Sequence, residues 1–174
     1  MKIINQVIFL LFACLAGCTQ SEISKSDVIE VKKTNLDGAQ DTEQETLSII
    51  KPDAVCFAEK INAKFQSAGL EIVAQKKIQL TMDQAMEFYK EHREKKFFGE
   101  LCTYICSGPV IVQILRGKDA IAKNRKIMGN TNPLKAETGT IRREFGKNIQ
   151  NNAAHGSDSK ESATREIKLF FPKS

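Results

Sequence analysis

The stretch Gly108-Pro109-Val110-Ile111-Val112-Gln113-Ile114-Leu115 predicts a buried strand in this chain of 174 residues. A nearly continuous apolar run behind turn-forming residues is typical of a strand that is covered on both faces. Gly108 and Pro109 end the helix expected before it, because neither residue continues a helix well. We therefore expect residues 110–115 to form a strand packed between layers of helices.

Helices and strands alternate on both sides of this stretch. We expect strands at 46–50, 70–80 and 151–155, and helices at 58–67, 81–92, 97–107, 118–128 and up to Phe170. Pro52 ends the first strand, Thr81 and Gln84 form a capping-box pattern, and Asp158 or Ser159 caps the last helix. This order predicts an α+β sandwich of the split βαβ kind, with a mainly antiparallel sheet covered by helices.

The first 18 residues have the pattern of a bacterial lipoprotein signal peptide. Lys2 precedes an apolar run at 7–16, and Leu15-Ala16-Gly17-Cys18 resembles a cleavage box whose cysteine becomes lipidated. We expect Cys18 to anchor the chain to a membrane if this leader is processed. The alternative is that translation begins further along the chain.

The charges divide the chain into two parts. Residues 19–45 hold seven acidic and three basic side chains and few large apolar ones, which predicts a flexible acidic tether. The whole chain nevertheless has a formal net charge of +5, so the domain predicted at 46–171 is basic. A basic domain suits an anionic partner such as a nucleotide, a nucleic acid or a membrane surface, and it also fits a lysine-rich solubilising surface.

The cysteines beyond Cys18 predict no covalent framework. Cys56, Cys102 and Cys106 are an odd number, which argues against a set of disulfides. Cys102 and Cys106 are one helical turn apart, but no second pair completes a metal site. We therefore expect helix packing there and no metal bound by protein side chains.

Phosphate recognition in this chain would depend on side chains. The sequence contains neither Gly-x-x-x-x-Gly-Lys-Ser/Thr nor a Gly-x-Gly-x-x-Gly that opens a helix. The candidates at loop and strand ends are Lys51, Arg125, Thr131 and Arg142, since arginine gives forked donors and lysine a mobile charge. Taken singly, each also fits a solvated surface charge.

His155 is the candidate nucleophile. A neutral imidazole is a good nucleophile near pH 7, and Glu166 on the following helix could turn back to orient its ring. Gly156 lacks a Cβ and leaves room for a bulky substrate. A histidine near a strand end can also be structural, and His92, between Glu91 and Arg93, is expected on the surface.

A set of motifs then makes one family stand out. In order and at matching spacing, residues 46–171 resemble nucleoside diphosphate kinase. The matching segments are Ser48-Ile49-Ile50-Lys51-Pro52-Asp53-Ala54-Val55, Phe88-Tyr89, Phe97-Phe98, Ser107-Gly108-Pro109-Val110, Gly129-Asn130-Thr131-Asn132-Pro133, Gly139-Thr140-Ile141-Arg142 and Asn152-Ala153-Ala154-His155-Gly156-Ser157-Asp158-Ser159.

This resemblance implies a ferredoxin-like fold and a ping-pong reaction. The terminal phosphate of a nucleoside triphosphate, typically ATP with Mg²⁺, would pass to a nucleoside diphosphate through phosphohistidine at His155. Glu166 would orient the ring and Ser157 would support Glu166. Lys51 and Tyr89 would flank the transferred group.

The remaining roles also follow from the resemblance. Arg125, Thr131 and Arg142 would hold the phosphates, and Asn152 with Lys51 would meet the ribose. Phe97 would stack on the base, with Leu101 and Ile149 as apolar neighbours. A stacked base has few specific hydrogen bonds, which predicts broad base tolerance.

The chain also departs from the family pattern. The loop after Lys51 is shorter than usual and contains Cys56-Phe57-Ala58-Glu59-Lys60, Lys96 replaces a proline, and Ile149 replaces a valine. Arg143 replaces a small residue and would either add a phosphate contact or disturb its loop. None of these changes removes a residue to which the resemblance gives a role.

Two functional hypotheses follow. The first is an active kinase that assembles as a homo-oligomer, either a tetramer or a hexamer. The alternative is a membrane-anchored nucleotide- or nucleic-acid-binding relative with little turnover, suggested by the basic domain and the altered first loop. The intact set of residues around His155 favours the kinase, and a nucleic-acid partner is the less favoured reading.

Overall fold

The computed structural model describes residues 43–172. The predicted signal peptide, Cys18 and residues 19–42 of the predicted tether lie outside the described residues and stay predictions. The first strand, β1 (Glu43–Ile50), begins earlier than residue 46, where the sequence pattern predicted it. Its polar start is held by pairing, since Glu43 to Glu45 lie opposite Lys118 to Arg116, and Arg116 Nη2 is 2.8 Å from Glu45 Oε1.

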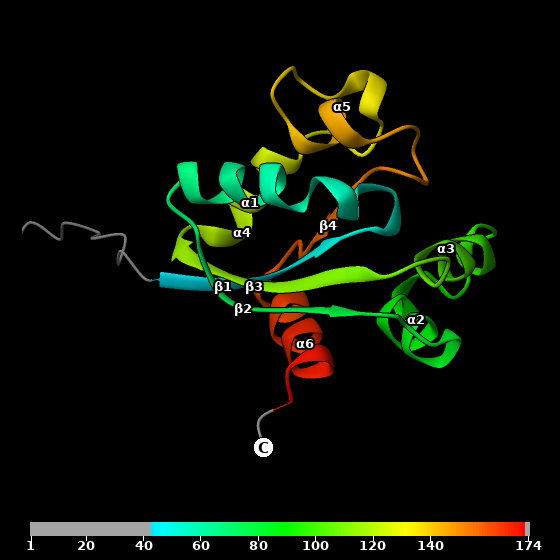
Figure 1. Cartoon of the computed structure of the whole chain (residues 1–174). Coiled ribbons are helices and arrows are strands. Elements are labelled where there is room, and N and C mark those ends of the chain that lie inside the picture. Colours follow the sequence, from blue (N-terminus) through cyan, green and yellow to red (C-terminus); the bar gives the residue numbers. More distant parts are fainter. Residues whose placement is uncertain (1–42, 173–174) are drawn as a thin grey trace, which may run out of the picture. The chain divides into compact units, whose positions relative to one another are not determined.

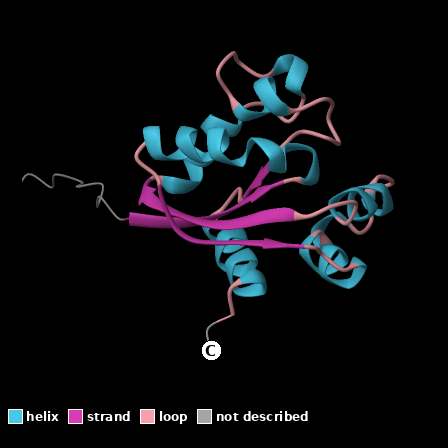
Figure 2. Cartoon of the chain, in the orientation of Figure 1, coloured by secondary structure: helices cyan, strands magenta, loops and turns pink. Residues whose placement is uncertain are grey.

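The centre of the fold is one antiparallel sheet with the strand order β2-β3-β1-β4. Figures 1 and 2 show these strands crossing the middle of the molecule. The other strands are β2 (Glu71–Ile78), β3 (Val110–Lys118) and β4 (Ala154–Gly156). β3 is an inner strand and is buried from Val110 to Leu115, as its apolar run predicted. The sheet order and the helices around it confirm the expected α+β, ferredoxin-like class.

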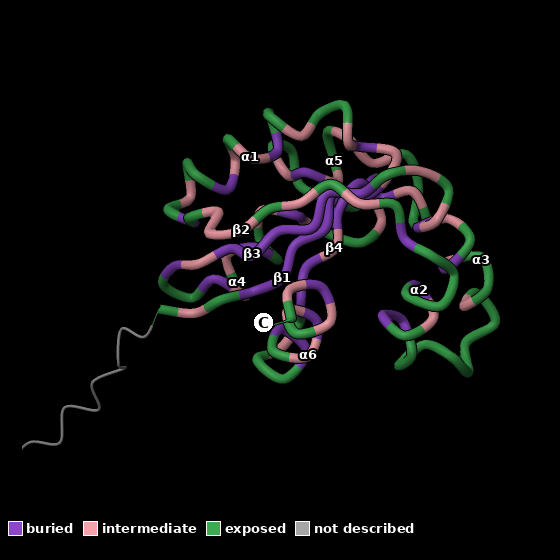
Figure 3. The backbone as a smooth tube through the Cα atoms, turned by 60° about the horizontal axis from the view of Figure 1, so that its bottom comes forward, coloured by how far each residue is buried: buried purple, intermediate pink, exposed green. Residues whose placement is uncertain are grey.

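Helices cover both faces of this sheet. On one face, α1 (Ala58–Ser67) and α4 (Ala120–Met128) enclose a core that includes Ile50, Phe65 and Leu115. On the other face, α2 (Met82–Phe88), α3 (Phe98–Ile105) and α6 (Lys160–Phe170) enclose a second core around Leu47 and Ile49. Figure 1 shows α1 and α6 on opposite sides of the strands, and Figure 3 shows the buried strands between them. Successive β1 residues therefore serve opposite cores, because side chains alternate along a strand.

Most helix ends follow from local chemistry. α1 ends where Gly69 adopts a φ of 74°, and α2 begins with the predicted capping box of Thr81 and Gln84. The α-helix expected to reach residue 92 ends at Phe88 and continues as the 3-10 turn η2 (Lys90–His92). Ser159, not Asp158, caps α6, since its Oγ accepts a hydrogen bond from Ser162 N at 3.0 Å.

The segment expected to be one long loop contains two short helices. These are η3 (Pro133–Lys135) and α5 (Ile141–Phe145), which the sequence pattern did not predict because each is only about one turn long. Strand β4 begins at Ala154 rather than at residue 151. Ala153 has a φ of 69°, a left-handed conformation that interrupts an extended strand immediately before His155.

Candidate active site

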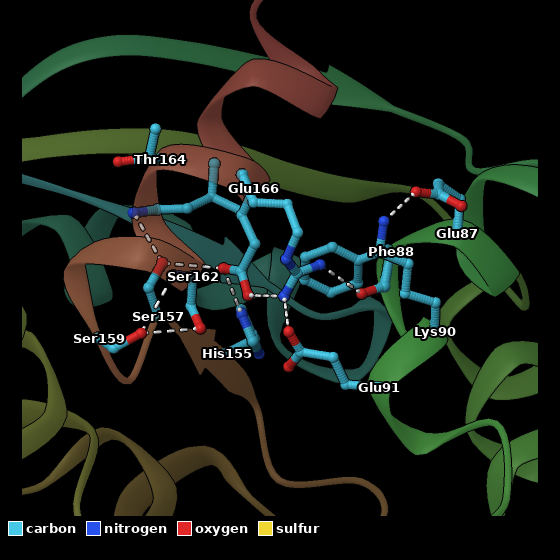
Figure 4. A network of polar contacts seen from close by, with 12 residues as sticks. Glu87, Phe88, Lys90, Glu91, His155, Ser157, Ser159, Ser162, Thr164 and Glu166 are labelled. Atoms are coloured by element: carbon cyan, nitrogen blue, oxygen red, sulfur yellow. Dashed lines mark hydrogen bonds and ion pairs between the residues drawn. The ribbon is translucent and has the colours of Figure 1, made fainter.

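His155 lies at the centre of β4, opposite Ile49 of β1. Its Nε2 is 3.0 Å from Glu166 Oε2 on α6. Figure 4 shows the two side chains pointing toward each other. A carboxylate accepts hydrogen bonds, so this contact places the ring proton on Nε2 and the free lone pair on Nδ1. The predicted contact of His155 with Glu166 is therefore present, and it leaves the lone pair of Nδ1 free.

Glu166 is fixed from several sides. Its side chain is buried, and Ser157 Oγ donates to Oε2 at 2.8 Å. Ser157 Oγ in turn accepts a hydrogen bond from Leu47 N at 3.2 Å, which connects the carboxylate to β1. Arg165 Nη2 is 3.6 Å from Glu166 Oε1. A buried carboxylate with these partners has little freedom to rotate, so the plane of the His155 ring is determined by the fold.

Arg165 is a site neighbour that the sequence did not predict. Its Nη2 is 2.9 Å from Glu91 Oε1, and its Nη1 donates to Phe88 O at 3.4 Å. Through these contacts Arg165 connects α6 with the end of α2 next to Tyr89. Its position directly before Glu166 was the only signal, and one arginine on a helix is too common a feature to predict this role.

Lys51 is a buried cation at the end of β1. Its Nζ donates to Asn152 Oδ1 at 2.8 Å, and only 5% of the residue is exposed. Burial and the nearby Arg142 guanidinium lower its pKa to about 7, and the Asp53 carboxylate opposes that fall. Asn152 Nδ2 donates to Ile149 O at 2.8 Å, which fixes the amide with its oxygen toward Lys51. Lys51 and Asn152, which the family resemblance places together at the ribose, thus form a joined pair in the structure.

Arg142, on α5, is oriented by backbone carbonyls. Its Nη1 donates to Gly129 O at 2.9 Å and its Nη2 to Ala154 O at 3.1 Å. Nη1 also lies 3.5 Å from Thr131 Oγ1. Burial and the charge of Arg125 lower the pKa of Arg142 to about 10, so it remains a cation at neutral pH. These carbonyls point the guanidinium toward the strand that carries His155.

Tyr89 follows α2 and packs beside the histidine. Its ring centroid is 6.4 Å from that of His155, with the two planes nearly perpendicular at 86°. The hydroxyl is buried and has no hydrogen-bond partner among the described residues. Burial raises the pKa of Tyr89 well above its ordinary value, so the hydroxyl stays protonated and can donate to an anionic group.

A cleft of about 750 Å³ unites most of the predicted set. Phe97 and Ile149 present apolar surface in it, with 48% and 58% of each residue exposed. The predicted residues that line the cleft are Lys51, Tyr89, Phe97, Leu101, Thr131, Arg142, Ile149, Asn152 and His155. Glu166 and Ser157 do not line the cleft, and their contacts reach it only through His155. The structure therefore brings together a histidine with a free ring nitrogen, several cationic and hydroxyl groups, and an apolar slot.

Arg125 lies beside the cleft instead of lining it, and His92, a surface residue as predicted, also lines the cleft. Arg125 is exposed on α4 and lines a neighbouring hollow of about 310 Å³ with Lys126 and Lys135, instead of the cleft that contains His155. His92, expected to be an ordinary surface residue, is exposed but lines the cleft. Its ring is stacked 6.3 Å from that of Tyr89 and lies 6.0 Å from that of Phe97. Its spacing from Tyr89 was a weak signal, because the turn of η2 that points it inward was not predicted.

The departures from the family pattern leave the cleft intact. The shortened segment after Lys51 forms the 3-10 helix η1 (Pro52–Phe57), which leads directly into α1. Arg143 donates to the carbonyls of Pro133 and Leu134 at 3.3 and 3.4 Å, so it stabilises its loop instead of disturbing it. Within residues 43–172, the structure shows no cluster of three or more histidine, cysteine or acidic residues that could hold a metal. No helix in this part of the chain is long and apolar enough to cross a membrane.

Comparison with known proteins identifies the family. The family model for nucleoside diphosphate kinase matches residues 44–174. This chain belongs to the nucleoside diphosphate kinase family. The nucleoside diphosphate kinase of Paracoccus denitrificans is 58% identical over 130 residues, which are 74% of this chain and 93% of that protein. That of Acidiphilium cryptum is 56% identical over the same shares of each chain.

Solved structures in the nucleoside diphosphate kinase family share the fold. The Aquifex aeolicus enzyme matches with a TM-score of 0.72 and 41% identity, over 75% of this chain and 96% of that one. The enzyme from Encephalitozoon cuniculi, crystallised without ligand, gives 0.73 and 35%, over 75% and 90% of the two chains. The sheet order and the helices of the present chain are therefore those of a nucleoside diphosphate kinase domain.

Proposed function

We propose that this member of the nucleoside diphosphate kinase family carries a phosphoryl group on Nδ1 of His155. The observation that carries the proposal is the contact of Nε2 with Glu166, which leaves the Nδ1 lone pair free in the cleft. Nδ1 attacks the terminal phosphorus of a nucleoside triphosphate, and the bond from that phosphorus to the bridging oxygen breaks. The nucleoside diphosphate departs with that electron pair.

The second half of the reaction reverses the first. A terminal phosphate oxygen of another nucleoside diphosphate attacks the phosphorus on His155, the phosphorus–nitrogen bond breaks, and Nδ1 regains its lone pair. The ring keeps its Nε2 proton throughout, so it is cationic while phosphorylated. Glu166 balances that charge from 3.0 Å, and no proton has to leave the site.

The phosphate chain is bound by the polar wall of the cleft. Lys51 and Arg142 supply positive charge, and Thr131 and Tyr89 supply hydroxyl donors. Phosphoryl transfer requires mainly alignment and charge neutralisation, which side chains fixed in this way provide. Arg125 lines the neighbouring hollow, and burial together with the charge of Arg125 lowers the pKa of Arg142. The ribose lies against the joined pair of Lys51 and Asn152.

The base occupies the apolar part of the cleft. Phe97 offers an exposed aromatic face, and Leu101 and Ile149 complete the slot. Stacking on such a face depends little on which base is present, so we infer that several nucleotides serve as donor and acceptor.

Mg²⁺ is the proposed cofactor, and the donor set of the cleft fits an ion carried by the nucleotide. The cleft-lining side chains are cationic or neutral, with no carboxylate among them, so the triphosphate itself would hold the ion. When bound, Mg²⁺ neutralises phosphate charge. Lys51 and Arg142 meet the remaining charge and position the phosphate that reacts.

We further propose that the chain assembles as a tetramer or hexamer and that Cys18 anchors it to a membrane. The anchor rests on the sequence Leu15-Ala16-Gly17-Cys18 and the apolar run before it. Membrane fractionation with a lipid label tests it. Label in the membrane fraction that disappears in Cys18→Ala supports the anchor, and an unlabelled chain in both proteins contradicts it.

Steady-state kinetics test the proposed reaction. We expect transfer from ATP to a pyrimidine nucleoside diphosphate with parallel double-reciprocal lines, as a covalent intermediate requires. The His155→Ala variant should fall to the background rate, and Lys168→Ala, on the outer surface of α6, should match the wild type. Intersecting lines, or turnover that survives in His155→Ala, would contradict the proposal. Strong nucleotide binding without any transfer would indicate the non-catalytic relative.

A further inference from the structure

Asp53 connects the turn before β4 with α3, and the proposed reaction gives Asp53 no role. It lies in the first turn of η1, and its carboxylate accepts hydrogen bonds through both oxygens. Oδ1 accepts from the hydroxyl of Tyr104 on α3, and Oδ2 accepts from Ala153 N at 3.2 Å. Asp53 and Tyr104 do not line the cleft, so they can affect a bound nucleotide only through the residues that they contact.

The first neighbour is the turn before His155. Ala153 is fully buried and has a φ of 69°, a left-handed conformation that is strained for a residue with a Cβ. Both of its backbone polar groups are held, because Lys51 N donates to Ala153 O at 2.9 Å and Asp53 accepts from Ala153 N. This turn places Asn152 against Lys51 and leads directly into β4. Asp53 thus supplies one of the contacts that keep the strained turn in place, together with Lys51 N and the hydrogen bond of 2.8 Å from Ala154 N to Asn152 O within the turn.

The second neighbour is Lys51 itself. It is faced by Arg142 from α5, by Asp53 from η1 and by the ring of Tyr104, whose centroid is 5.7 Å from Nζ. The cleft that Lys51 lines also contains four other titratable side chains, which are Tyr89, His92, Lys147 and His155. Among all these groups, Asp53 is the one whose negative charge raises the pKa of Lys51, against burial and Arg142.

We propose that Asp53, oriented by Tyr104, is a positioning residue that keeps Lys51 charged and aligned for phosphate binding. This role rests on the proposed function, since Lys51 acts only if phosphates enter the cleft. Asp53 supplies charge and holds the Asn152–Ala153 turn, whereas Tyr104 supplies orientation alone. Substitution of Asp53 should therefore change the pH dependence of kcat/KM, and substitution of Tyr104 should not.

The pH dependence of kcat/KM separates these contributions. In Asp53→Asn the carboxylate charge is lost, the pKa of Lys51 falls further, and Lys51 loses its proton at a lower pH. The alkaline limb of the profile should therefore move to lower pH, so that kcat/KM falls by about tenfold at pH 8 and by less than about twofold at pH 6. In Tyr104→Phe the charge and the ring remain, so KM should rise about two- to fivefold while the limb stays in place. Glu59→Gln, the same change at an exposed carboxylate in the first turn of α1, should alter neither.

Two results would overturn this inference. One is an alkaline limb in Asp53→Asn that coincides with that of the wild type, and the other is an equal loss at every pH, which indicates structural damage alone. Phosphorylation of the same proteins by labelled ATP at pH 6 keeps the two proposals apart. If the wild type takes up label and the limb of Asp53→Asn is unmoved, only the role of Asp53 fails. If the wild type takes up none, the proposed function fails.

Discussion

Two clefts in the part of the chain that the structure describes have similar sizes and very different content. The cleft at His155 is about 750 Å³, and a second one, between the start of β1 and the outer side of α6, is about 780 Å³. The second is lined by Glu43, Glu45, Lys160 and Lys168 around the apolar surface of Ile167 and Phe171. Its charged residues are exposed, whereas Lys51 and Asn152 in the first cleft are buried and bonded to each other.

This difference teaches that volume alone does not make a site. Charged groups at the surface of the second cleft keep their hydration and cost the fold little. In the first cleft the fold has buried Lys51, and Glu166 behind His155, and has fixed each with directed hydrogen bonds. Such desolvated, oriented charges are costly to keep, and they are what stabilises a charged transition state.

After the loss of His155 itself, the largest effect expected in the first cleft comes from Lys51. Replacing it with methionine keeps most of the volume and removes the charge that faces the phosphates. We expect kcat/KM to fall by about 10²–10³-fold, the usual cost of losing one fixed electrostatic contact in the transition state. Transfer from ATP at saturating acceptor measures it, and a loss below tenfold would place Lys51 outside the reaction.

The contacts behind His155 should have the next largest effect. Glu166→Gln keeps the shape but removes the charge that balances the phosphorylated ring, so we expect about a 10–100-fold loss in kcat. Ser157→Ala removes a hydrogen bond to Glu166 and should cost less. A double variant whose loss equals the product of the single losses would show that the two residues act independently, contrary to their 2.8 Å contact.

The burial of Lys51 should also be visible in the stability of the nucleotide-free protein. The folded pKa of about 7 lies below the ordinary 10.5, so the unfolded chain binds more protons between these values. The wild type should therefore gain about 3–5 kcal/mol of unfolding free energy from Lys51 as pH rises from 7 toward 10.5. Urea unfolding at several pH values checks this, with Lys51→Met as the reference that lacks the gain. Equal slopes for the two proteins would show that Lys51 is not desolvated.

The second cleft should give the smallest effect. Lys168 and Thr164 are exposed on α6, so alanine at either position should leave kcat/KM within about twofold and stability within about 0.5 kcal/mol. The same assays used for Lys51→Met measure both. A loss of activity comparable to that of Glu166→Gln would show that the second cleft also contributes to the reaction, contrary to this account.

The sequence predicted most of this architecture and the composition of the site. Apolar runs and capping residues located α1, α6 and the start of β3 closely, because burial and local hydrogen bonds determine those elements. β3 continues to Lys118, beyond the predicted end at Leu115, and α4 begins at Ala120 instead of Lys118. The motif around His155 predicted which side chains meet there, and the structure brings all of them into or directly behind one cleft except Arg125.

What the sequence could not predict depends on contacts between distant segments. Arg165 and His92 reach the site only through the packing of α6 on α2 and the turn of η2. The left-handed Ala153 is held by Lys51 and Asp53, about a hundred residues away along the chain. No local propensity favours that conformation for alanine, so only the assembled fold explains it.

One histidine carries the phosphate in the proposed reaction, and the chain has only two histidines. Incubation with terminally labelled ATP, followed by acid and alkali treatment of the isolated protein, tests this most directly. We predict label that is lost in acid and stable in alkali, approaches one phosphate per chain, transfers to an added nucleoside diphosphate, is present in His92→Ala and is absent in His155→Ala. Label that persists in His155→Ala, or that resists acid, would contradict the proposed reaction.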